Sequence, residues 1–467
     1  MKKSILFLLT GFVFLQINLL GQNTVNVFDE ILFYDGYNSI EKLDSIMEPV
    51  PEGVKRLKTS SVTVKLTEEQ LDMLSGSIRM DVVIKAACDN YDRIGNVNLA
   101  FVPKDSVDYT PESRIELGRF ITPFMDKNRK PDTVPYTYDV PFLTHVFQDQ
   151  QLRAEYDFWI ELDVFGVPYD ANAKIQGCAG RDDVFYGTVS FATTATSNEL
   201  ETDNVFIPLF FKHRLTNYNA GETDEVGKTV KSISFTIEEN LQDAQFVLIT
   251  SNHGANSGGE EYNRRWHYIY LNDEQILEYR PGRTSCEPFR KYNTQLNGIY
   301  NGNYGTTTYM TDAQWQSFSN WCPGDKIDTR IINLGALEAG TYTFKINVPE
   351  ARFVNKEGYI PMSVYFQGKK DGKISVPVNI ANLDKKESVI KAFPNPFENE
   401  VNVYFENDYN DEVSIEMYNI LGQRAIAEYQ QKDNNQIIIQ TSSLSSGMYY
   451  LKVMVGNEIH TIKIVRQ

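Results

Sequence analysis

Short strand-like runs separated by turn residues recur along most of this 467-residue chain. Gly, Pro, Asn and Asp end these runs, and the 27 Tyr and 27 Phe residues favour strands over helices. The pattern predicts an all-β protein built from antiparallel sandwiches. Helical periodicity is scarce, and residues 67–74 are the best candidate for a short helix. The predicted strands are 61–66, 80–85, 96–101, 158–165, 205–211, 232–237, 245–250, 267–271, 341–348, 362–366 and 401–405.

The N-terminal segment has the features of an export signal. Lys2 and Lys3 precede an apolar run at 5–20, and the small residue Gly21 follows it. The run is too short for a secure membrane anchor, and no other stretch is long enough to span a bilayer. We therefore expect residues 1–21 to be a signal peptide and the mature protein to be exported, without a membrane anchor, as a monomer.

Charge and motif content exclude several classes of function. The net charge of −17 opposes binding to nucleic acid or to anionic lipid. The chain has no Gly-rich phosphate loop, no GxSxG turn and no HExxH pair. The five histidines are scattered without the spacing of metal ligands, which also excludes a copper monooxygenase. We expect no metal and no cofactor. The histidines are His145, His213, His253, His267 and His460.

Four cysteines, Cys88, Cys178, Cys286 and Cys322, fit an exported protein with two disulfides. None forms the close CxxC pair of a zinc or redox site. Three pairings are possible, and one of them, Cys286–Cys322, would close a loop rich in Gly, Asn and Tyr.

The last part of the chain reads as a module of its own. It contains Phe-Pro-Asn-Pro-Phe at 393–397, Tyr-Asn-Ile-Leu-Gly-Gln at 418–423 and Leu-Ser-Ser-Gly-Met-Tyr-Tyr-Leu-Lys-Val at 444–453. These three motifs, in this order, resemble the C-terminal sorting domain of type IX secretion substrates. The resemblance implies that the type IX secretion machinery carries the chain from the periplasm to the cell surface or the medium.

Two segments place acids beside aromatic rings and cations, Cys-Asp-Asn-Tyr-Asp-Arg at 88–93 and Gly-Gly-Glu-Glu-Tyr-Asn-Arg-Arg-Trp-His at 258–267. A third segment, Ser-Asn-Trp-Cys-Pro-Gly at 319–324, places a tryptophan next to a cysteine. Carboxylates at strand ends can act as acids or bases, and aromatic rings can stack on sugar faces. The alternatives are a surface Asp–Arg pair, a plain loop that enters a strand and a core tryptophan.

With Gly-Arg-Phe-Ile-Thr-Pro at 118–123, these segments resemble the peptide-N-glycosidase F family over roughly residues 22–375. The resemblance implies two side-by-side eight-stranded jelly-roll sandwiches, at 22–195 and 196–378, with the active site between them. A linker at 379–388 and the small β-sandwich sorting domain at 389–467 would follow.

The resemblance also implies roles for individual residues. Asp92 falls on the principal catalytic aspartate and Glu261 on a second acid from the other sandwich. A third acid falls at Asp163, or at Glu161 or Asp157 if the register differs. The residues implied to contact substrate are Tyr91, Arg93, Phe165, Tyr262 and Trp321.

The implied activity is hydrolysis of the amide bond between asparagine and the proximal N-acetylglucosamine of N-linked glycoproteins, which releases the glycan and leaves aspartate. The sequence departs from the family near both acids. Gly259 and Asn263 stand where the family has cysteines, and the local partner of Cys88 is absent, which leaves Cys178 as an alternative partner. The rival reading is a non-catalytic glycan-binding sandwich, in which the acids would be dispensable.

Overall fold

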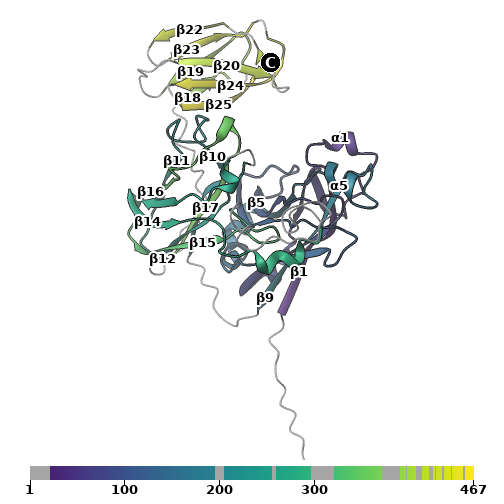
Figure 1. Ribbon diagram of the computed structural model, residues 1–467. Coiled ribbons are helices and arrows are strands. Elements are labelled where there is room, and N and C mark those ends of the chain that lie inside the picture. The colour runs from purple at the N-terminus through teal and green to yellow at the C-terminus, as the bar shows by residue number, and fades with distance from the viewer. Residues whose placement is uncertain are drawn as a thin grey trace, which may run out of the picture. The chain divides into compact units, whose positions relative to one another are not determined.

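The computed structural model describes residues 22–194, 204–254, 259–295, 320–370 and 390–466, the last range with gaps at 396, 406–412, 420–423, 426–427, 434–435, 443 and 456–457. The expected signal segment 1–21 and the linker 379–388 lie outside these residues. The chain divides into two compact units, Met1–Ile380 and Ala381–Gln467. Most of the described elements are strands and the helices are short, so the predicted all-β class is confirmed (Figure 1).

The first sandwich consists of two antiparallel sheets. The four-stranded sheet has the order β1–β9–β4–β7, formed by Gln22–Tyr34, Asp183–Thr194, Ser77–Ala86 and Thr133–Asp139. The five-stranded sheet has the order β2–β3–β8–β5–β6, formed by Val54–Lys58, Ser61–Lys65, Tyr156–Val164, Ile94–Pro103 and Ser113–Ile121. This sandwich therefore has one strand more than the eight expected, because β2 folds back on β3 as a hairpin and extends the sheet edge.

Strand β4 shows why these segments form sheets. Its burial alternates, with Ile78, Met80, Val82 and Ile84 in the core and the intervening side chains more exposed. A period of two is the signature of a strand with one buried face.

Five short helices connect the strands of this sandwich: α1 (Ile40–Leu43), α2 (Glu68–Met73), α3 (Leu143–Gln148), α4 (Gln150–Glu155) and α5 (Tyr169–Lys174). Helix α2 is the short helix predicted at 67–74. Thr67 caps it, and Gln70 returns the hydrogen bond in a capping box.

The second sandwich pairs two four-stranded sheets. One has the order β10–β17–β12–β15, formed by Asn204–Leu215, Ile360–Lys370, Leu241–Thr250 and Thr329–Leu337. The other has the order β11–β16–β13–β14, formed by Val230–Ile237, Gly340–Asn347, His267–Leu271 and Glu274–Tyr279. Among the described residues of its connections lie three 3₁₀ turns: η1 (Glu260–Tyr262), η2 (Glu287–Tyr292) and η3 (Val354–Lys356).

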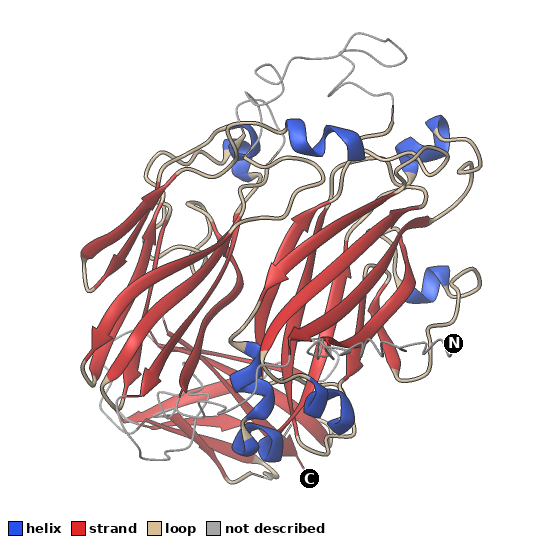
Figure 2. Cartoon of the chain, turned by 90° about the horizontal axis from the view of Figure 1, so that it is seen from below, coloured by secondary structure: helices blue, strands red, loops and turns tan. Residues whose placement is uncertain are grey.

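The two sandwiches stand side by side, with helices and loops gathered at both ends of the strands (Figure 2). Strand β6 of the first sandwich contacts β10, β12 and β17 of the second. Phe206, Val247 and Tyr365 from the second sandwich join the apolar core of the first. The seam between the sandwiches is thus a buried interface that combines apolar and polar contacts.

A fully buried ion pair lies in this seam. Arg119 Nη2 is 2.6 Å from Glu116 Oε2, and neither side chain is exposed to solvent. Arg119 Nη1 also donates to Ser251 Oγ at 2.9 Å and to the carbonyl of Pro361 at 2.8 Å. Ser363 Oγ donates to Glu116 at 2.5 Å. Glu116 and Arg119 both belong to the first sandwich, and groups of the second sandwich complete their hydrogen bonding.

Loops of both sandwiches meet at one end of this seam. The loop between β4, which ends at Ala86, and β5, which begins at Ile94, lies there, because its Asn90 donates to Gln295 Oε1 at 2.6 Å. The end of β6 binds the connection that enters β15: Ile121 donates to the carbonyl of Asp325 at 3.0 Å, and Gly324 donates to that of Ile121 at 3.0 Å. This end brings candidate site residues of both sandwiches together.

The C-terminal unit is a small sandwich of two four-stranded sheets. One has the order β18–β19–β23–β22, formed by Ile390–Phe393, Glu400–Phe405, Gln436–Gln440 and Glu428–Asp433. The other has the order β21–β20–β24–β25, formed by Arg424–Ala425, Val413–Asn419, Gly447–Val455 and Glu458–Arg466. Its core contains Val401, Val403, Ile439, Leu451 and Val453. The unit has its own core, as a separate module requires.

The buried pair makes a prediction about stability. Replacing Arg119 with Leu leaves the Glu116 carboxylate buried and unpaired, which costs about 3–5 kcal/mol. We expect urea unfolding of the full-length protein to show a loss of this size in the transition of the two-sandwich unit. The matched control is Arg79→Leu, which breaks the more exposed pair of Arg79 with Asp81 and costs less than about 1 kcal/mol. Equal losses in the two variants would contradict the role given to the buried pair.

Candidate active site

Asp92 lies in the loop between β4 and β5, and the loop is held at its start. Cys88 forms a disulfide with Cys178, 90 residues further along the chain. This pairing is the alternative that the sequence left open. The buried Asp89 carboxylate accepts hydrogen bonds from the backbone N–H groups of Tyr91 at 2.9 Å and Val167 at 2.6 Å. The backbone just before Asp92 is therefore fixed by a covalent bond and by a buried acid.

Arg93 is oriented by the same acid. Its Nε is 2.7 Å from Asp89 Oδ2, and its guanidinium carbon lies 5.2 Å from the centre of the Tyr91 ring. Backbone groups are fixed as well, since Arg93 N donates to Thr122 Oγ1 at 2.8 Å and Thr122 N donates to the carbonyl of Arg93 at 2.8 Å. The Gly118–Pro123 motif thus supports the Asp92 loop from the neighbouring strand.

Glu261 comes from the second sandwich, in the 3₁₀ turn η1. Gly254 N donates to Glu261 Oε2 at 3.4 Å, and the backbone and side-chain N–H groups of Asn320 donate to the Glu261 carbonyl at 3.0 and 2.7 Å. The adjacent Glu260 has a structural environment, because it is buried and bonded to Arg265 and to the backbone N–H of Arg352. The two neighbouring glutamates thus have different environments: Glu260 is a structural acid of the core, and Glu261 is the candidate site acid.

The Glu261 carboxylate of the second sandwich influences Asp92 of the first. Burial away from water and the nearby Glu261 carboxylate raise the pKa of Asp92 to about 8. Burial also raises the pKa of Glu261. Tyr262 hydrogen-bonds to Glu261, and burial together with both acids raises the pKa of its phenol. Asp92, Glu261 and Tyr262 therefore form one electrostatic group. We call Asp92 and Glu261 the acid pair.

Asp163 lies near the end of strand β8. Its carboxylate is 2.7 Å from Lys212 Nζ of the second sandwich, and Asn98 Nδ2 donates to it at 3.2 Å. Lys212 also donates to Asn96 Oδ1 at 3.0 Å. Asp163 is thus an acid of β8 that pairs with a cation of the second sandwich.

The two other acids considered for this position bind cations of their own sandwich. Glu161 is buried and accepts from Arg114 Nε at 2.8 Å and from Tyr109 at 2.5 Å. Asp157 pairs with Lys65 at 3.1 Å and Lys104 at 3.2 Å.

The predicted substrate-contact residues have different degrees of exposure. Tyr91, Arg93 and Tyr262 are half-buried beside the acid pair, and Phe165 packs edge-on against Tyr37 with ring centres 5.2 Å apart. Trp321 is only 8% exposed and packs in a small cluster with Ile121, Ile249 and Ile327. Its indole therefore has the environment of the core tryptophan that the sequence left as an alternative.

Trp321 is anchored by a second disulfide. Cys286 and Cys322 are bonded, as predicted, with Cα atoms 5.4 Å apart. Asn320, which holds the Glu261 carbonyl, lies two residues before Cys322.

Two important residues were missed in the sequence. Asp89 was read only as a neighbour of Asp92, although its spacing of four residues from Arg93 was a usable signal. Lys212 had no signal, because its side chain reaches the first sandwich from an irregular part of β10. Among the residues with described positions, no group of three or more His, Cys, Asp or Glu side chains could hold a metal ion.

Three protein-family models match this chain, and together they cover most of both sandwiches and of the C-terminal unit. The family model "Peptide-N-glycosidase F, N terminal" matches residues 24–178, and "Peptide-N-glycosidase F, C terminal" matches residues 217–367. "Secretion system C-terminal sorting domain" matches residues 391–467. A comparison with curated proteins finds no match.

Solved structures show a similar fold. Two crystal forms of PNGF-II superpose with TM-scores of 0.53 and 0.51 at 18% and 19% identity, over 75% and 76% of this chain. This chain spans 66% of the PNGF-II chain, slightly less than two thirds. PNGase F from Flavobacterium meningosepticum, a glycosylasparaginase, has a TM-score of 0.47 at 15% identity over 76% of this chain and 98% of its own.

The environment of Asp92 makes a prediction about stability and pH. The folded protein holds a proton on Asp92 up to about pH 8, whereas the unfolded chain releases it near the ordinary pKa of 3.8. Stability is therefore lost as the pH rises between these values. We expect Asp92→Asn, which removes the ionisable group, to raise the melting temperature by about 2–8 °C at pH 9 and by much less at pH 4.

The measurement is differential scanning calorimetry at both pH values. The matched control is Asp273→Asn, which changes an exposed acid paired with Lys345 and should give no gain that depends on pH. An equal effect of Asp92→Asn at pH 4 and pH 9 would show that Asp92 has no raised pKa.

Proposed function

The chain belongs to the peptide-N-glycosidase F family, and from this membership we propose that it is a glycoamidase that hydrolyses the amide bond between asparagine and the proximal N-acetylglucosamine of N-linked glycoproteins. It carries a type IX sorting domain and is exported to the cell surface or the medium. In the described part of the chain, no helix has the length and apolarity needed to cross a membrane.

The observation that carries the proposal is the placement of Asp92 beside Glu261 of the other sandwich, where burial and the Glu261 charge raise its pKa to about 8. Hydrolysis of an amide needs a base for the attacking water and then an acid for the leaving nitrogen. A group with a pKa near the working pH serves both steps, because it can accept a proton and return it. At pH 7 about one Asp92 in ten is ionised and ready to act as the base.

In the proposed reaction, ionised Asp92 takes a proton from water as the water oxygen bonds to the asparagine side-chain carbonyl carbon. The carbonyl oxygen becomes an oxyanion. When the C–N bond breaks, Asp92 returns its proton to the nitrogen, so that a glycosylamine leaves and aspartate remains on the peptide.

Arg93 is the candidate stabiliser of the oxyanion. Asp89 holds one edge of its guanidinium, and the side chain keeps 18% of its surface exposed, so the remaining N–H groups can donate to a substrate oxygen. Glu261, oriented by Tyr262, is proposed to accept a hydrogen bond from the linkage nitrogen or from a sugar hydroxyl. Tyr91 and Phe165 are proposed to contact the glycan, and the buried Trp321 would offer little of its ring surface.

Asp163 is proposed to support the reaction indirectly, through its contact between the two sandwiches. Its ion pair with Lys212 links strand β8 of the first sandwich to β10 of the second. Glu261 and Asp92 stand on different sandwiches, so their separation depends on such links. In this proposal the ion pair of Asp163 with Lys212 holds Asp92 and Glu261 at a fixed separation, and Lys212 is a positioning residue.

The first test is incubation of the full-length protein with a defined N-glycopeptide, followed by mass spectrometry. We expect release of the intact glycan and conversion of asparagine to aspartate. Asp92→Ala should lower kcat/KM by about 10²–10⁴-fold, the usual contribution of an acid–base group.

The matched control for this test is Asp81→Ala, which removes an acid on β4 that pairs with Arg79 and should leave activity unchanged. Binding of the glycopeptide without cleavage would favour the glycan-binding alternative. Cleavage by Asp92→Ala at the rate of the unchanged protein would exclude Asp92 as the acid–base group.

The second test concerns Lys212. We expect Lys212→Met to lower kcat/KM by about 10- to 100-fold, since small displacements of catalytic groups have effects of this size. Because Asp92 acts in its ionised form, kcat/KM should rise with pH through about 8 in the unchanged protein. In the variant the midpoint should move to lower pH, as Glu261 no longer lies at its original separation from Asp92.

The control for the second test is Lys345→Met, which breaks the pair with Asp273 on the outer sheet of the second sandwich. It should change neither the rate nor the midpoint. A loss of rate in Lys212→Met with an unchanged midpoint would reduce Lys212 to a general stabilising role.

A further inference from the structure

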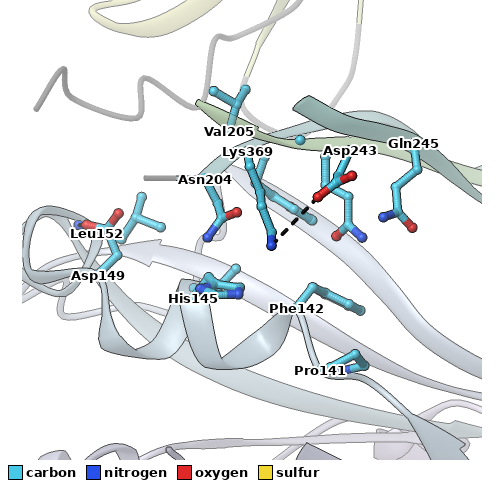
Figure 3. A pocket seen from close by; sticks show the side chains of 14 residues that line it. Pro141, Phe142, His145, Asp149, Leu152, Asn204, Val205, Asp243, Gln245 and Lys369 are labelled. Carbon is cyan, nitrogen blue, oxygen red and sulfur yellow. Dashed lines mark hydrogen bonds and ion pairs between the residues drawn. The ribbon is translucent and has the colours of Figure 1, made fainter. Parts of the chain in front are cut away.

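A cavity lies in the seam between the two sandwiches, at the end opposite the acid pair. Its walls come from α3 and α4 of the first sandwich and from β10, β12 and β17 of the second (Figure 3). The volume is about 200 Å³, which is enough for one small ring.

The sheet wall offers an apolar ring beside two amides. Phe206, Gln367 and Gln245 are direct cross-strand partners on β10, β17 and β12, so they form a row across the sheet. Near this row, Lys369 Nζ lies 3.7 Å from Asp243 Oδ2, and both side chains remain largely exposed. Figure 3 shows the side chains of Lys369, Asp243 and Gln245 along this wall.

The helix wall adds a second ring. Phe142 is half-buried and stacks on Phe206 with ring centres 5.8 Å apart and planes 6° from parallel. The cavity thus has an apolar side built from both sandwiches and a polar side built from one sheet.

The amides of the sheet wall have hydrogen-bonding capacity to spare. Among the described residues, the buried Oε1 of Gln367 has no hydrogen-bond partner, and the Gln245 side chain makes no hydrogen bond. A buried amide oxygen without a partner is costly, which points to a donor that is brought by a ligand or by water. The oxygen is shielded from solvent, but the last torsion of a Gln side chain is soft, so the amide can turn toward a ligand.

We propose that this cavity is a second carbohydrate-binding site, which takes one pyranose ring. A sugar has an apolar C–H face for an aromatic ring and a rim of hydroxyls for amide, carboxylate and ammonium groups. An apolar side chain would leave Gln245 and Gln367 unsatisfied, and a small ion would make no use of Phe142. The site goes beyond the proposed amidase reaction, since it lies at the other end of the seam and needs none of the acids there.

The test is saturation-transfer NMR on the full-length protein with three probes, the methyl glycosides of N-acetylglucosamine, mannose and galactose. We expect at least one probe to bind. The Gln245→Ala/Gln367→Ala double variant should weaken that binding at least tenfold, since two hydrogen bonds to the sugar are removed. The matched control is Gln275→Ala, an amide on the outer strand β14 whose loss should leave binding unchanged.

Three outcomes would overturn the site: no saturation transfer with any probe, equal binding by the double variant, or binding that is lost in Asp92→Asn and retained in the double variant. The last result would place the sugar at the acid pair. Thermal melting of the double variant shows whether it is folded. Because the readout is binding, a failure of the glycopeptide assay would leave this inference standing.

Discussion

The buried ion pair between Glu116 and Arg119 is the interaction on which the arrangement of the two sandwiches depends. Both charges belong to β6 of the first sandwich, yet Ser251, Pro361 and Ser363 of the second complete their hydrogen bonding. Two charges without solvent exposure are tolerated only where their hydrogen bonds are made. The sandwiches therefore cannot slide or separate without leaving charge unsatisfied, and their relative position becomes a fixed property of the fold.

That fixed position is what gives the acid pair its chemistry. Asp92 and Glu261 belong to different sandwiches; burial raises the pKa of both, and the Glu261 charge raises that of Asp92 further. Such an arrangement opposes stability and is maintained by surrounding contacts, as is usual at catalytic sites. Asp89 and Asn320 are these contacts: one holds the loop before Asp92, and the other holds the backbone of Glu261.

Features that depend on local sequence were predictable, and those that depend on distant packing were not. The alternation of Ile78, Met80 and Val82 identifies a strand, and Thr67 with Gln70 identifies the start of a helix. Asp92 and Glu261 are candidates because their segments resemble motifs of the family. The partner of Cys88 was left open, since Cys178 is distant in the chain, and Lys212 was missed.

Lys212 illustrates the limit of the sequence. Its backbone adopts a left-handed conformation, with φ of 46°, where the pairing of β10 with β17 is irregular. Nothing in the residues around it indicates this geometry, and only the folded seam shows that its ammonium group meets Asp163. The extra strand β2 is hard to predict for a different reason. A short strand at the edge of a sheet has too few residues to show a clear pattern.

The placement of the two disulfides links the assembly of the site to the compartment in which the chain resides. One bond begins four residues before Asp92, and the other lies two residues beyond the asparagine that supports Glu261. Each half of the acid pair is thus tethered by its own oxidised bond. In the reducing cytoplasm, where the chain is synthesised, both tethers are open, and they close only after export. Oxidation therefore times the formation of both tethers, so that the acid pair gains this rigid support only after the chain has left the cytoplasm.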